Sequence, residues 1–89
     1  MDFRFDDPFR DICQQILDQN KTPDEWSEIE SDDMFQHGPY CGGFDATEGE
    51  FCFSLYREDG EFWFQVSLEQ VRQIVGGRLK YVTIRPSES

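Results

Sequence analysis

The side chains that could do chemistry are one histidine, three cysteines and an excess of carboxylates. His37 and Cys41 lie four positions apart, a spacing open to a nucleophile and its base or to two metal ligands. Both fall in a stretch rich in Gly and Pro, and no third residue orients them or completes a zinc-finger spacing. Asp45, Glu48 and Glu50 surround a glycine but lack the Asp spacing and distal Glu of a calcium loop. We therefore expect no enzyme, no catalytic or metal-binding residues and no cofactor.

The carboxylates are concentrated in the middle of the chain. There are 19 acidic and 8 basic residues, which gives a net charge of −11. Residues 22–56 contain no Lys or Arg, whereas acids and bases balance over residues 57–89. This balance excludes direct binding of nucleic acid, which needs a basic surface. The acids of the middle segment are Asp24, Glu25, Glu28, Glu30, Asp32, Asp33, Asp45, Glu48 and Glu50.

The length of 89 residues predicts one small domain, residues 1–89, with a loose tail at 86–89. Nine Phe, three Tyr and two Trp supply the core of so small a domain. An odd cysteine count favours reduced thiols in a cytoplasmic protein, with one bridge and one free thiol as the alternative. We find neither a membrane-spanning segment nor a secretory signal in the pattern.

Two helices are predicted before the first strand. The apolar spacing indicates an amphipathic helix over 7–20, with Asp7 as its N-cap. A second helix opens at Thr22, where Glu25 completes a capping box, and ends between residues 30 and 33. If it reaches Asp32, then Asp24, Glu28 and Asp32 stack along one side, and like charges at this spacing destabilise a helix.

The remainder is predicted to be mostly antiparallel sheet. Residues 40–46 suggest a bent edge strand, and residues 51–57 and 61–67 form a hairpin with its Phe residues on one face. A short helix follows from Ser67 to a left-handed stop at Gly76. The last strand covers residues 79–85.

The assembled order is ααβββαβ, an α+β domain with a three- to four-stranded sheet and one helix before the last strand. We expect the Phe face to pack on the first and third helices. Trp63 should lie on the opposite face, half covered by a helix.

A concentrated negative face attracts basic partners and speeds their association. Aromatic residues among the acids could supply the buried anchors of an interface. We therefore expect an acidic binding protein, a monomer or weak dimer, that blocks a basic toxin, nuclease or other nucleic-acid-binding protein. The predicted partner-binding residues are Asp24, Glu25, Trp26, Glu28, Asp32, Asp33, Phe35, Asp45 and Glu48.

In size and charge alone, the chain resembles small acidic inhibitors, a type that includes bacterial immunity proteins against nuclease toxins and phage-encoded mimics of DNA. Three alternatives stay open. The acids could serve solubility only. The protein could be a subunit or adaptor that self-associates or pairs through a sheet edge at residues 40–46 or 79–85. A small metal-binding protein or enzyme is the third possibility.

Overall fold

The computed structural model describes residues 2–29 and 31–87, and only the backbone of residues 31–34. Three helices and seven strands lie in these ranges. The elements are β1 (Asp2–Arg4), α1 (Asp7–Asp18), α2 (Pro23–Ser27), β2 (Ser31–His37), β3 (Tyr40–Asp45), β4 (Glu50–Arg57), β5 (Gly60–Val66), α3 (Leu68–Val75), β6 (Tyr81–Thr83) and β7 (Arg85–Pro86).

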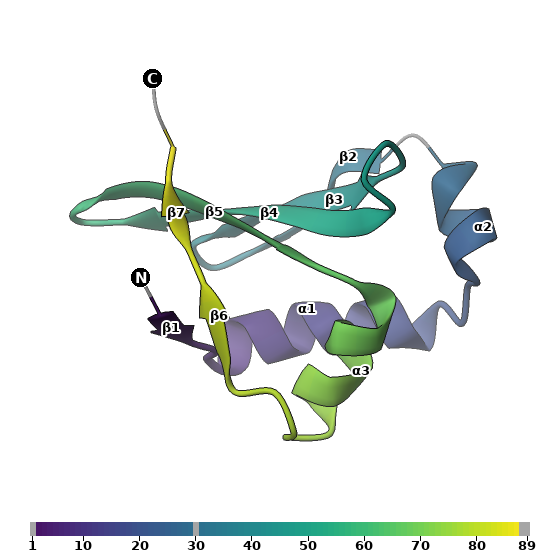
Figure 1. The fold of residues 1–89 in the computed structure, drawn as a ribbon, viewed down its shortest axis with the longest axis horizontal. Coiled ribbons are helices and arrows are strands. Elements are labelled where there is room, and N and C mark those ends of the chain that lie inside the picture. Colours follow the sequence, from purple (N-terminus) through teal and green to yellow (C-terminus); the bar gives the residue numbers. More distant parts are fainter. Residues whose placement is uncertain (1, 30, 88–89) are drawn as a thin grey trace.

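Five strands form the main sheet, in the order β2-β3-β4-β5-β7, and β1 pairs with β6 in a separate two-stranded sheet. Every pairing is antiparallel. Helices α1 and α3 lie on one side of the main sheet, and α2 stands at its end (Figure 1). The α+β class is confirmed, but the order ααβββαβ and the count of three to four strands are wrong.

The largest difference lies in residues 31–45, where the sequence predicts a single strand at 40–46 and the structure has two. Residues 31–45 form a hairpin in which His37 pairs with Tyr40. Gly38, at φ +58°, opens the two-residue turn, as a type II′ turn requires of its first central residue. Strand β3 therefore lies between β2 and β4 and is not an edge strand. The Gly38-Pro39 pair is the tight turn of this hairpin.

The predicted last strand is divided between the two sheets. In β6, Val82 pairs with Phe3 of β1, whereas in β7 Arg85 pairs with Trp63 of β5. Between them Ile84 is buried in the core. The chain thus crosses from one sheet to the other at a buried side chain.

The helix ends follow local hydrogen bonds. Asp6, not Asp7, caps α1: its side chain accepts from the Phe9 backbone N–H at 3.3 Å. The predicted capping box at Thr22 is confirmed, and so is that at Ser67. Gly76 is right-handed at φ −75°, and the left-handed residue is Gly77.

Helix α2 ends at Ser27 with Glu28 as its C-cap, well before residues 30–33. One turn with a single buried side chain gives little to offset the repulsion among its acids, so the helix does not extend. The helix therefore does not reach Asp32, which lies in β2, and the stack of Asp24, Glu28 and Asp32 does not form.

The Phe-lined face of the sheet is the core, as predicted. Phe9 of α1 lies 5.1 Å, centroid to centroid, from each of Phe53, Phe64 and Tyr40. Val71 and Ile74 of α3 join the same buried cluster. Gly42 also faces this side: a Cβ there would meet the Cys52 carbonyl oxygen and would lie 2.8 Å from the Phe53 Cα.

The opposite, outer face of the main sheet is not covered by any of the described helices (Figure 1). The expectation that a helix half covers Trp63 is wrong. Trp63 is half-buried because the Arg85 guanidinium lies over its ring, 5.4 Å from the centroid.

Replacing Gly42 by Ala should lower the free energy of unfolding by about 2–3 kcal/mol, since the sheet must open to admit a methyl group. Urea unfolding followed by circular dichroism measures it. Gly76→Ala is the matched control, because its φ is negative and the nearest atom to its Cβ is 3.3 Å away. It should cost less than about 1 kcal/mol. Equal losses in the two variants would contradict the close approach at Gly42.

Two buried groups make the fold sensitive to alkali. Burial raises the pKa of the Cys13 thiol from 9.0 to about 12. Burial, followed by the hydrogen bond from the Tyr40 hydroxyl to Asp6 Oδ1 (2.8 Å), raises the pKa of Tyr40 above its ordinary range. Above the ordinary pKa values of a thiol and a phenol, the unfolded chain therefore loses protons that these two groups retain in the folded chain.

The free energy of unfolding should fall as the pH rises from 9 towards 12, because the unfolded state binds fewer protons there. Cys13→Ala should reduce that slope by up to about 1.4 kcal/mol per pH unit, despite lower stability at pH 8. Urea titrations at a series of pH values measure the slope. The control Val75→Ala changes an exposed residue without a titratable group and should leave the slope unchanged. An unaltered slope in Cys13→Ala would refute the assignment.

Candidate acidic interaction site

Two acidic segments come together at one end of the molecule, where α2 stands beside the turn between β3 and β4 (Figure 1). We call this region the acidic end. Among the described side chains, six carboxylates lie here: those of Asp24, Glu25 and Glu28 in α2 and at its C-cap, and those of Asp45, Glu48 and Glu50 in the turn and at the strand ends beside it.

Trp26 holds the two segments together. Its ring lies 6.3 Å from that of Phe44 and 5.2 Å from that of Phe51, centroid to centroid. Phe44 and Phe51 face each other across β3 and β4, and the next pair outward is Asp45 with Glu50. The buried face of α2 therefore rests on the strand ends that carry the acidic turn.

The six carboxylates divide into two groups. Glu25 accepts from the Thr22 backbone N–H, and Asp45 accepts from the backbone N–H groups of Thr47 (2.9 Å) and Glu48 (3.4 Å). These two carboxylates shape the backbone.

The side-chain carboxylates of Asp24, Glu28, Glu48 and Glu50 make no hydrogen bond or ion pair with any residue that the structure describes. The first three are exposed and Glu50 is half-buried. These four carboxylates are the ones that a partner could bind.

Positive charge is scarce at this end. Within the described ranges, the Arg–carboxylate pairs all lie elsewhere, between Arg10 and Asp7, Arg57 and Asp59, and Arg72 and Glu69. The nearest base in sequence, Lys21, places its Nζ over the Trp26 ring, 5.1 Å from the centroid. The negative field of the acidic end also reaches the sheet: burial, and after it the Asp45 carboxylate, raise the pKa of Cys52.

The structure corrects two of the predicted partner-binding residues. Trp26 is 0% exposed and Phe35 is 4% exposed, and their rings pack together in the core. Neither can anchor a partner from the surface. Aromatic residues among acids predicted interface anchors. Instead, Trp26 lies on the buried face of the one-turn helix α2, and Phe35 lies on the inward face of strand β2.

The structure does not place all of the other acidic residues that were considered for the partner-binding site. Asp32 and Asp33 belong to β2, but their side chains, and the whole of Glu30, lie outside the described part of the chain. Glu50 was missing from the predicted site. Its signal was the strand pairing, which sets Glu50 opposite Asp45.

The considered pair of His37 and Cys41 does not form. His37 Nε2 lies 3.5 Å from Asp11 Oδ2, on the side of the sheet that faces α1. Cys41 follows the buried Tyr40 and so points to the outer face. In the described ranges, no three His, Cys, Asp or Glu side chains gather as metal ligands would, and no cysteine forms a disulfide. Nor is any described helix long and apolar enough to cross a membrane.

No family model matches the chain, and no curated protein or solved structure matches it at a significant level. The case for a function therefore rests on the geometry and charge of the acidic end.

Proposed function

We propose that this protein is a non-catalytic binding protein whose acidic end occupies the basic surface of another protein. The partner is one that binds or cleaves nucleic acid, so the acidic end competes with the phosphate backbone for its Lys and Arg side chains. The protein is then an inhibitor of the immunity type, acts in the cytoplasm and binds as a monomer or weak dimer.

One observation carries this proposal: Trp26 fixes two acidic segments, 17 or more residues apart in the sequence, at the same end of the molecule. Like charges held together repel, which is a cost for the free protein. A basic partner relieves that repulsion. It also finds the carboxylates already in place, so little conformational entropy is lost on binding.

The mechanism needs no chemical step. Exposed carboxylates steer a basic partner at long range, and the bound acidic end excludes the substrate sterically. Because the partner's charges would otherwise meet phosphate, high salt should weaken both its contact with nucleic acid and its contact with this protein.

Pairing through a sheet edge has less support. Residues 40–46, one of the two predicted edges, lie inside the sheet, and the other is divided between β6 and β7. The main sheet ends at β2 on one edge and at β7 on the other. Strand β2 has a register shift between Ser31 and Phe35, and β7 has only two residues. Such irregularities hinder pairing with a further strand.

The triple variant Asp24→Lys, Glu28→Lys and Glu48→Lys should abolish capture of basic proteins from a lysate of the source cells. Its control is a triple variant of Asp2→Lys, Glu58→Lys and Glu61→Lys, exposed acids away from α2 and the β3–β4 turn. Both variants change the net charge by the same amount, so only the position of the charge differs. Captured proteins are identified by mass spectrometry at about 50 mM and about 200 mM salt.

The wild type and the control should capture the same nucleic-acid-binding protein at low salt, and added DNA should displace it. The association rate with that protein should drop at least tenfold in the acidic-end variant. If both variants lose capture and association rate equally, the effect depends on net charge and not on the acidic end. If added DNA does not displace the captured protein, the proposal that the partner binds nucleic acid is wrong.

A further inference from the structure

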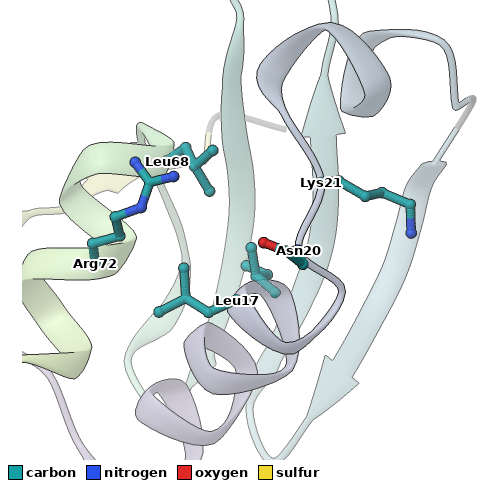
Figure 2. Close-up of a pocket in the computed structure, with 6 residues that line it drawn as sticks. Leu17, Asn20, Lys21, Leu68 and Arg72 are labelled. Carbon is teal, nitrogen blue, oxygen red and sulfur yellow. The ribbon is translucent and has the colours of Figure 1, made fainter.

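A hollow of about 290 Å³ opens where the end of α1 meets the start of α3. Figure 2 shows it from the side, with residues of both helices around it. It is separate from the acidic end, since none of the six carboxylates lines it. The lining residues are Ile16, Leu17, Asn20, Lys21, Leu68 and Arg72.

The floor of this hollow is apolar. Ile16 and Leu68 are buried, and the half-buried Leu17 points into the space between the two helices (Figure 2). Pockets for small molecules begin at about 300 Å³, so this one has room for a body of only a few carbons. The three apolar side chains of the floor offer a contact surface for a short alkyl group.

The rim of the hollow is positive, in contrast to the protein as a whole. Arg72 extends its guanidinium group past Leu68 at the edge of the hollow, whereas Lys21 turns its ammonium group away (Figure 2). None of the acidic residues that the structure describes lines the hollow. Arg72 is the group on the rim that can hold a negative charge.

Arg72 is only weakly engaged by the protein itself. Its Nη1 lies 3.4 Å from Glu69 Oε2, and both side chains are more than half exposed. Exposed pairs of this kind contribute little to stability and exchange readily. A ligand carboxylate can therefore compete with Glu69 for the guanidinium, with a bidentate geometry that the 3.4 Å contact lacks.

We propose that this hollow binds a small monocarboxylate with a short branched alkyl body. Arg72 pairs with the carboxylate, while Leu17, Leu68 and Ile16 enclose the alkyl group. The volume of the hollow limits the size of the alkyl group, and the Arg72 guanidinium on the rim selects a negatively charged ligand. The site is independent of the proposed function and of the acidic end.

Isocaproate is the first probe, and its neutral amide, isocaproamide, tests the charge. Binding is followed from the methyl resonances of Leu17 and Leu68 in the NMR spectrum of the full chain. Isocaproate should shift them saturably and should bind about tenfold more tightly than the amide, as expected for a charge-assisted hydrogen bond. Equal affinity of acid and amide would overturn the role of Arg72, and absence of shifts would overturn the site.

Arg72→Gln should weaken isocaproate binding about tenfold and leave isocaproamide binding unchanged. Arg4→Gln is the matched control, because it removes the same charge from an exposed residue in β1. Equal weakening in the two variants would show a general charge effect and contradict a site at Arg72.

Leu17→Phe fills the hollow without adding charge and should abolish binding of both probes. Val75→Phe makes a similar enlargement at an exposed position of α3 and should leave binding intact. Thermal unfolding of both variants verifies that they fold. Because these probes are not proteins, loss of binding at Leu17→Phe leaves the test of the acidic end unaffected, and the two proposals can fail separately.

Discussion

The packing of Trp26 against Phe44 and Phe51 is the contact that determines where the acidic residues of α2 lie on the surface. A helix of five residues has no stability of its own, because nucleation of a helical turn is unfavourable. Complete burial of one Trp side chain is worth about 4–6 kcal/mol, from its area of about 150–250 Å² at about 25 cal/mol per Å². That burial outweighs the repulsion among the acidic residues of α2, and it fixes their position on the protein.

The same side chain shows what the arrangement costs. Among the residues that the structure describes, none accepts a hydrogen bond from the Trp26 Nε1–H, although the atom is buried. A buried unpaired donor costs about 1–3 kcal/mol. The net gain from Trp26 is therefore only a few kcal/mol, and the capping box of Thr22 and Glu25 adds about 1 kcal/mol. Helix α2 therefore depends on one side chain and one cap, and its net stabilisation is small.

Local signals in the sequence were sufficient wherever neighbouring residues determine the structure. The capping boxes at Thr22 and Ser67 and the alternating Phe residues of β4 and β5 were predictable from spacing alone. The failures involve contacts between distant residues. Nothing near Ile84 indicates that the chain changes sheets there, because β1 and β5, its partners on either side, are far away in the sequence.

For the candidate site too, local features were predictable and contacts between distant residues were not. The concentration of acids is a property of composition, so residues 22–56 were identified correctly as free of bases. Which aromatic residues stay exposed depends on tertiary packing, and for that reason Trp26 and Phe35 were assigned to the surface although they are buried. The relation between the two acidic segments was equally hidden, since it exists only through the Trp26 contacts.

The carboxylates of the acidic end perform two tasks that a single residue could not combine. Glu25 and Asp45 accept backbone hydrogen bonds, which fix the start of α2 and the β3–β4 turn. Because these two are engaged, the backbone around Asp24, Glu28 and Glu48 is set before any partner arrives. An acidic segment without such internal bonds would have to be ordered on binding, at a cost of conformational entropy. On the function proposed above, a rigid backbone and unpaired carboxylates are together what suits the acidic end to binding.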